Sequence, residues 1–197
     1  MNQYAFNYKP RKAPPVVRRR DRPIRLLAGI SRTIDSVTSA AFTRAMRGTA
    51  TGVNVVTTDG PAGRFGLTIS AFSSVSAEPP TVLVCINRRS PACNAARENR
   101  AFCVNVLSTA QRPLADTFSG NPADGEPYGF ETGSWTYSQT GSPLLDDSIA
   151  SFDCTLDSAI DAGTHTIFVG TVRAVEHNDT SPLLYTDRSY RRACSEV

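Results

Sequence analysis

Residues 66–87 read GLTISAFSSVSAEPPTVLVCIN, and this stretch sets the pattern for the rest of the chain. Apolar and small hydroxyl residues alternate in its first half, and a double proline then leads into an unbroken apolar, largely β-branched run. Side chains on a strand point alternately to its two sides, so one side enters a core and the other carries the hydroxyls. The hydroxyls expected on roughly that side are those of Thr68, Ser70 and Ser73.

A row of small hydroxyls is suited to an anion. Such groups donate hydrogen bonds to phosphate oxygens without filling the space that a flat cofactor needs, and nearby backbone amides add further donors. Serine and threonine are also frequent at strand edges and in turns. The stretch by itself therefore allows two interpretations, a phosphate site or an ordinary strand edge.

Length and composition favour one mainly β domain. The chain has 197 residues with 13 glycines and 13 prolines, which suit many strands joined by turns better than a helical bundle. No apolar run approaches the roughly 18 residues needed to cross a bilayer. Five cysteines without a Cys-x-x-Cys spacing indicate neither a disulfide framework nor a zinc site. We expect a cytoplasmic protein in a reducing compartment, with no membrane contact.

Basic charge is concentrated at the N-terminus. Residues 1–25 hold eight basic residues against Asp21, whereas the whole chain has a net charge of only +3. We interpret residues 1–35 as a basic, disordered extension, because such a segment buries too little apolar area to offset its ordering entropy. A patch for nucleic acid is the alternative, although no nucleic-acid motif accompanies it. Residues 36–197 form the predicted domain.

Turn and cap residues divide this domain into elements. Glycine, proline and capping hydroxyls mark most of the boundaries. Helices are predicted over residues 40–47, 91–100 and 111–118. Strands are predicted over residues 52–58, 65–70, 81–87, 101–107, 135–138, 149–160 and 164–175, and the first two of these should form a hairpin through the turn at 59–63.

Ser90 precedes Pro91 at the predicted start of the second helix. A helix N-terminus attracts anions, and Arg88 and Arg89 add positive charge just before it. The ordinary interpretation is a capping serine beside exposed arginines. The residues alone do not favour either the anion site or the ordinary helix cap.

The chain has only two histidines. They are far apart and no carboxylate-rich motif accompanies them, so no metal centre is expected. His177 lies in a polar stretch and is predicted to be a solvated turn residue. His165 opens an apolar strand after Gly163 and Thr164, where a strand end can aim a side chain into a cleft.

Several separate blocks, in the same order, resemble the flavin reductase family with an FMN-binding split β-barrel, the reductase components of two-component flavin monooxygenases. The resemblance spans about residues 38–192. Its blocks are residues 66–76 with the double proline and following strand, residues 87–90, 102–107 and 163–170, and residues 182–185.

The resemblance implies a function and a site. It implies an NAD(P)H-dependent reductase that binds FMN, or FAD, takes hydride from NADH or NADPH, and works as a homodimer whose flavin site lies at the two-fold interface. Its reduced flavin would pass to a flavin-dependent monooxygenase. The flavin contacts it implies are Thr68, Ser70, Ala71, Phe72, Ser73, Cys85, Ile86, Asn87, Ser90 and Phe102. His165 would position the nicotinamide, helped by Arg188 and Tyr190.

Two other functions share this expected fold. One is a split-barrel reductase that delivers electrons to a corrin, a ferric complex or another acceptor. The other is a flavin-binding electron carrier without turnover. Fold-level similarity does not distinguish them.

Overall fold

The computed structural model describes residues 36–194, and strands dominate this part of the chain. The first element is helix α1 (Ser39–Arg47), which begins where the sequence predicts it. The Thr38 hydroxyl caps it by accepting a hydrogen bond from the Ala41 amide at 3.3 Å. The predicted mainly β fold is confirmed.

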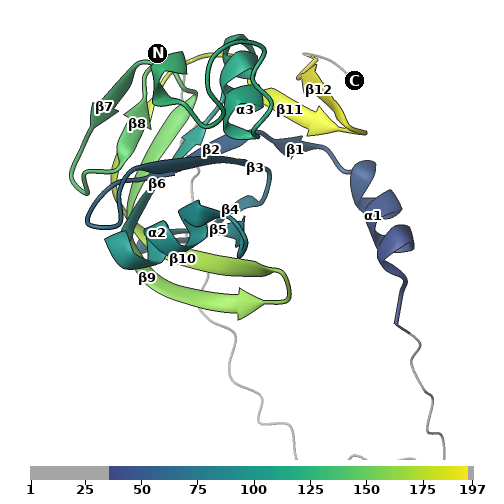
Figure 1. Cartoon of the computed structure of the whole chain (residues 1–197), viewed down its shortest axis with the longest axis horizontal. Helices are drawn as coiled ribbons and strands as arrows, with labels where there is room; N and C mark the ends of the chain where they lie inside the picture. The colour runs from purple at the N-terminus through teal and green to yellow at the C-terminus, as the bar shows by residue number, and fades with distance from the viewer. Residues whose placement is uncertain (1–35, 195–197) are drawn as a thin grey trace, which may run out of the picture. The chain divides into compact units, whose positions relative to one another are not determined.

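The central feature is a seven-stranded antiparallel sheet in the order β3-β2-β6-β9-β10-β5-β4 (Figure 1). The double proline lies at the β4–β5 turn and leads into β5, as predicted, whereas β4 before it is a strand that was not predicted. The strand bounds are β2 (Asn54–Thr58), β3 (Phe65–Ile69), β4 (Phe72–Ala77), β5 (Pro80–Asn87), β6 (Ala101–Val106), β9 (Ala150–Ala162) and β10 (His165–His177).

The inner faces of all seven strands pack into one apolar cluster, so the sheet curls around a common core. Its edge strands, β3 and β4, are consecutive in the chain and joined by Ser70 and Ala71. The barrel therefore remains open between β3 and β4, as in the predicted split barrel. Each strand contributes to the core: Val56, Ile69, Phe72, Val84, Phe102, Leu156 and Phe168.

Two helices cover this barrel. Helix α2 (Pro91–Asn99) packs against β2, β3 and β6, and buries three alanines and a cysteine. Helix α3 (Arg112–Phe118) follows the short 3-10 turn η1 (Thr109–Gln111) and packs against β3. Beyond α3, the turn η2 (Phe130–Thr132) and the hairpin of β7 (Trp135–Tyr137) with β8 (Pro143–Leu145) complete a second apolar cluster.

The predicted strand over residues 52–58 is divided in two. β1 (Thr51–Gly52) pairs with β11 (Leu183–Thr186), whereas β2 pairs with β3 and β6. The change of partner occurs at Val53, whose amide donates to Leu183 and whose carbonyl accepts from Leu107. The residue pattern over 52–58 cannot reveal this switch, because both halves are extended.

One further prediction is corrected near the C-terminus. His177 is the last residue of β10, paired with Ala150, and not part of a turn, although it is exposed. The final segment, for which no strand is predicted, is a hairpin of β11 with β12 (Ser189–Arg192). Asp187 and Arg188 form its turn with positive φ angles of 46° and 59°.

Among residues 36–194, no helix combines the length and apolar character needed to cross a membrane. The predicted N-terminal extension, residues 1–35, lies outside the described residues.

Candidate functional site

The outward face of β4, β5 and β10 brings several predicted site residues together. His165 lies opposite Asn87, Ile167 opposite Cys85, and Leu83 opposite both Val169 and Ser73. Residues directly opposite one another on paired strands point to the same side of a sheet. Asn87, Cys85, Ser73 and His165 therefore share one face.

This face has an apolar floor. Ile167 and Cys85 are half-buried and lie beside Ile160 of β9, which is 55% exposed. Burial raises the pKa of the Cys85 thiol, which keeps it neutral at physiological pH. A neutral thiol and two isoleucines form a surface suited to one side of a flat heterocycle.

Three predicted flavin contacts point the other way. Ile86 is 1% exposed and Phe102 is 0% exposed, and both belong to the core cluster. Phe72 is half-buried, packs against the same cluster, and lies 5.5 Å from the Phe152 ring between centroids. Neighbouring residues on a strand face opposite sides, so Cys85 and Ile86 cannot both present side chains to one ligand. Phe102, Ile86 and Phe72 are core residues.

The segment from Asn87 to Ser90 leads from this sheet face to α2. The Asn87 side chain accepts a hydrogen bond from the Arg89 amide at 3.0 Å, and its carbonyl accepts one from the Ser90 amide at 2.9 Å. Ser90 occupies the capping position of α2, but its hydroxyl makes no capping hydrogen bond. The Ser90 hydroxyl at the start of the helix thus stays available to an anion, whereas the Cys93 amide of the first turn already donates to the Ser90 carbonyl at 3.0 Å.

A cavity of about 560 Å³ opens at this helix terminus. Its volume falls within the usual range of small-molecule sites. Asn87, Arg89 and Ser90 line one side, and β3 residues line another. The remaining wall consists of residues that the sequence does not single out: Arg64, Tyr128 and Phe130.

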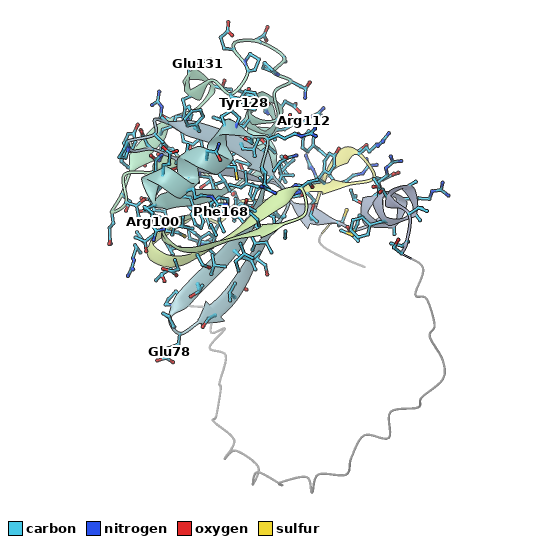
Figure 2. All side chains as sticks on the ribbon, turned by 60° about the horizontal axis from the view of Figure 1, so that its bottom comes forward. Glu78, Arg100, Arg112, Tyr128, Glu131 and Phe168 are labelled. Atoms are coloured by element: carbon cyan, nitrogen blue, oxygen red, sulfur yellow. The ribbon has the colours of Figure 1, made fainter. Side chains whose placement is uncertain are left out.

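These three residues come from loops around the barrel. The Arg64 guanidinium lies 4.5 Å from the centre of the Phe130 ring. Tyr128 has a φ of 63°, which is uncommon for a residue other than glycine. Figure 2 shows Tyr128 at the same end of the molecule as Arg112, the first residue of α3. The one sequence signal for this wall is the pair of aromatics, Tyr128 and Phe130, inside an otherwise polar loop.

The predicted hydroxyl row is not continuous. The Thr68 hydroxyl donates to the Ala115 carbonyl of α3 at 2.9 Å, and the Ser73 hydroxyl donates to the Ser74 carbonyl at 3.1 Å. Ser70 and Ala71 are exposed in the link between β3 and β4, where the Ala71 carbonyl accepts from the Cys85 amide at 3.1 Å. The alternation predicted through Ala71 breaks there because one strand ends at Ile69 and the next begins at Phe72.

His165 lies directly after the turn that joins β9 to β10. It is exposed, and its Nδ1 lies 2.9 Å from the Thr164 hydroxyl. Gly163 in the turn has a φ of 58°, a left-handed conformation that glycine adopts without strain. The tight turn therefore presents His165 at the edge of the same face that carries Asn87 and Cys85.

The structure does not place Arg188 and Tyr190 with His165. They line a separate cavity of about 480 Å³ with Arg112 and Asp116 of α3. In Figure 1 the β11–β12 hairpin and the tip of the β9–β10 hairpin lie at opposite ends of the molecule. Burial and a hydrogen bond to Asp116 raise the pKa of Tyr190 to about 12, and its ring lies 5.3 Å from the Arg112 guanidinium. Within the chain, Tyr190 thus contacts α3 and connects the β11–β12 hairpin to it.

No group of three or more His, Cys, Asp and Glu side chains within residues 36–194 is arranged to hold a metal ion. The site just described consists of hydroxyl, amide, guanidinium and apolar groups. Such groups bind and orient ligands, and His165 adds one imidazole at the edge of the face.

Comparisons with known proteins identify the family of this chain. The family model of the flavin reductase like domain matches residues 46–193. FMN reductase (NADH) RutF of Escherichia coli is 42% identical over 165 residues, which cover 80% of this chain and 98% of RutF.

Two solved structures have the same fold. BorF, the flavin reductase component of a bacterial two-component tryptophan halogenase, has a TM-score of 0.71 and 32% identity, covering 81% of this chain and all of BorF. NADH:FAD oxidoreductase SgcE6 of Streptomyces globisporus C-1027 has a TM-score of 0.73 and 27% identity, covering 83% of this chain and 99% of SgcE6. The chain belongs to the flavin reductase-like domain family.

Proposed function

We propose that this protein is an NAD(P)H-dependent flavin reductase that reduces FMN and releases it to a separate enzyme. The proposal rests on one observation: two parts of the structure, a sheet face and a helix terminus with a cavity, meet at Asn87. On one side lies an outward sheet face with an apolar floor and His165 at its edge, and on the other lies the α2 terminus with its cavity. A flavin mononucleotide has the same two parts, a flat ring and a phosphate on a flexible chain.

The residues present fit the phosphate end of FMN. Pro91 has no N–H and the Cys93 amide is bonded to the Ser90 carbonyl, so the phosphate would be held by the positive end of the helix dipole and the remaining amides of the first α2 turn. Arg89 adds a full positive charge beside them, and the Ser90 hydroxyl is not engaged in capping. Together they would hold a phosphate through charge-assisted hydrogen bonds.

The sheet face fits the ring end. Cys85 and Ile167 would support one side of the ring, and Asn87, Ser73 and the exposed Ser70 and Ala71 lie at its borders. When bound, the flavin supplies the redox chemistry by accepting a hydride from the nicotinamide. The chain itself has to hold two flat rings together and exclude water. His165 would orient the nicotinamide carboxamide from the edge of the face.

The choice of flavin and donor rests on relatives. RutF is named an FMN reductase that uses NADH, whereas SgcE6 is named an NADH:FAD oxidoreductase. RutF shares the higher identity, and the α2 cavity accounts for the single phosphate of FMN. We therefore propose FMN as the preferred flavin and NADH as the donor.

The proposed partner is a flavin-dependent oxygenase. BorF serves a two-component halogenase, and a split of reduction and oxygen chemistry between two proteins requires that the flavin leave its first site. A site on an open sheet face allows this release. We also propose a homodimer, because a second copy over Ile160 and Ile167 would cover the ring and exclude water from it.

Nicotinamide oxidation tests the function. The full-length chain is mixed with NADH or NADPH and with FMN, FAD or riboflavin, and the nicotinamide absorbance is followed. We expect turnover to rise with free FMN and to exceed that with riboflavin. Binding of FMN without nicotinamide consumption would instead establish an electron carrier. Transfer of electrons to a ferric complex or corrin without added free flavin would establish a different acceptor.

A further inference from the structure

The cavity at the start of α2 has a second positively charged side chain, which the phosphate contacts proposed above do not use. Its charged lining residues are Arg89, beside Ser90, and Arg64, which immediately precedes β3. Among residues 36–194, no carboxylate lines this cavity, so two positive charges surround it without an opposing charge. Such a hollow favours a dianion, and a phosphate monoester carries close to two negative charges at about pH 7.

Two aromatic residues hold the Arg64 side chain at the wall of the cavity. Its guanidinium lies 4.5 Å from the centre of the Phe130 ring, and its Nη1 donates to the Tyr137 hydroxyl at 3.4 Å. Stacking on a ring occupies the flat face of a guanidinium and leaves its N–H edge for a ligand. Arginine pairs with phosphate oxygens through that edge. Arg64 can therefore bind a phosphate that Ser90 and Arg89 hold from the helix.

Tyr128 lines the same cavity and lies at one end of a closed loop. The Gly120 and Tyr128 amides both donate to the Thr117 carbonyl of α3, at 3.0 and 3.1 Å, which brings the two ends of residues 120–128 together. Compact surface loops whose ends lie close are frequently functional. This closure holds Tyr128 at a φ of 63°, a conformation that costs energy for a residue with a side chain.

The Tyr128 ring packs over Gly120, at the other end of this loop. A Cβ atom on Gly120 would lie 2.6 Å from the Tyr128 hydroxyl oxygen and 3.0 Å from the ring carbon that carries it. The absence of a side chain at Gly120 thus makes room for the ring. Although Tyr128 is 47% exposed, the loop closure and the packing over Gly120 fix its ring at the cavity wall. Strain that the surrounding structure maintains in this way is typical of ligand sites.

We infer that Arg64 and Tyr128 form a clamp on the phosphate end of FMN, and that this clamp sets how slowly the flavin leaves. Arg64 pairs with the phosphate, and the Tyr128 ring shields that pair from water, which strengthens it. Both residues lie outside the blocks that carry the family resemblance. The inference rests on the proposed function, which requires release of the flavin, and it names the residues that control that release.

Flavin binding tests the Arg64 charge without any turnover. Fluorescence titration of the full-length chain gives the dissociation constants of FMN and riboflavin, and stopped-flow mixing gives the dissociation rate of FMN. Arg64→Gln should weaken FMN about fivefold through faster dissociation, as expected for the loss of an exposed charge pair. Riboflavin has no phosphate, so its affinity should stay near wild type. Arg173→Gln is the matched control, because Arg173 bonds the Thr155 hydroxyl and does not line this cavity.

A pair of glycines tests the Tyr128 ring without changing Tyr128 itself. Gly120→Ala displaces the ring, whereas Gly125→Ala has the same φ of 85° and its nearest neighbour, Glu131 Oε1, is 3.8 Å away. Both variants therefore add the same backbone strain, and only the first moves the ring. Gly120→Ala should raise the FMN dissociation rate at least about threefold, and Gly125→Ala should leave it unchanged. Tyr128→Gly, which removes the ring and relieves the backbone, should match Gly120→Ala.

Wild-type FMN dissociation in Arg64→Gln and Tyr128→Gly, with folding verified by circular dichroism, would overturn the inference. Equal acceleration by Gly120→Ala and Gly125→Ala would also overturn it, because loop strain alone would then explain the effect. Failure of the proposed function is distinct, since it would appear as an absence of NADH oxidation by the wild type, whereas the clamp is measured by flavin dissociation alone.

Discussion

The Ser90 hydroxyl lies where a helix cap usually adds stability, yet its proposed role is in ligand binding. It occupies a capping position and leaves the capping hydrogen bond unmade, whereas Ser108 forms a complete capping box with Gln111 before α3. A capping bond stabilises a helix by about 1 kcal/mol. Ser90 makes no such contribution, which leaves ligand binding as the role proposed for it.

Ser90→Ala should therefore weaken FMN binding without lowering stability. A hydrogen bond to a charged phosphate contributes roughly 1.5–3 kcal/mol, so FMN affinity should fall at least about tenfold while riboflavin affinity stays close to wild type. Flavin fluorescence titration measures both. Ser108→Ala is the reference, with an expected loss of about 1 kcal/mol in stability and unchanged FMN binding. Equal losses for FMN and riboflavin in Ser90→Ala would place the phosphate elsewhere.

His165→Ala should slow the reduction of bound FMN by NADH and leave FMN affinity near wild type. A misplacement of about 1 Å costs roughly 100-fold in a reaction governed by orientation. Stopped-flow reduction by NADH, compared with reduction by dithionite, isolates the nicotinamide step. His177→Ala is the control, because His177 is the other exposed histidine and lies at the far end of the same strand. If NADH reduces bound FMN in His165→Ala at the wild-type rate, His165 has no part in positioning the nicotinamide.

The Tyr190 phenol should ionise above the ordinary pKa of a tyrosine. Burial and the Asp116 hydrogen bond raise its pKa from 10.0 to about 12, so the folded chain holds this proton more tightly than the unfolded chain. The stability linked to it is complete below about pH 10 and is lost as the pH rises through about 12. Ultraviolet titration of phenolate should show a late component that Tyr190→Phe removes. An unchanged titration curve in Tyr190→Phe would contradict this.

Helix α3 packs closely against strand β3, and this close contact depends on Gly66. A Cβ atom on Gly66 would lie 2.4 Å from the Phe118 ring and 3.3 Å from that of Phe130, in the second apolar cluster. The absence of a side chain at Gly66 lets the aromatic residues cover β3. The same rings stand beside the proposed phosphate cavity, which Phe130 and Gly66 both line.

Gly66→Ala should lower the free energy of unfolding by about 1–3 kcal/mol, because the aromatic rings have to move or the strand has to shift. Gly52→Ala is the matched control on β1, since nothing lies within 4 Å of its Cβ position. Urea unfolding measures both. The expectation is wrong if the two variants have equal midpoints.

For the whole molecule, the proposed dimer explains an exposed apolar face. Ile160 lies on this face beside Ile167 and is 55% exposed. Val175 is exposed to the same extent but lies near the other end of β10. Ile160→Arg should shift the chain from dimer to monomer in sedimentation velocity and lower FMN turnover, because an arginine would be buried unpaired at the interface. Val175→Arg adds the same charge and should leave the dimer intact. A dimer in both variants would place the interface on another face.

Sequence by itself determined many of the helices and strands of this protein. Thr38 caps the first helix, the turn at residues 59–63 folds β2 onto β3, and Ser90 with Pro91 begins α2, each through local backbone chemistry. The family resemblance came from the same local blocks. These features depend on residues within a few positions of one another, which a sequence displays directly.

Only the tertiary structure decided which side chains face the site. Cys85 points outward and Ile86 inward because register with β10 and packing of the core set the side of each residue. Tyr128 and Ser90 line the same cavity, although 38 positions separate them in the chain. Such contacts arise from the curling of the sheet and the packing of its loops, which depend on the whole core at once and leave little local signal.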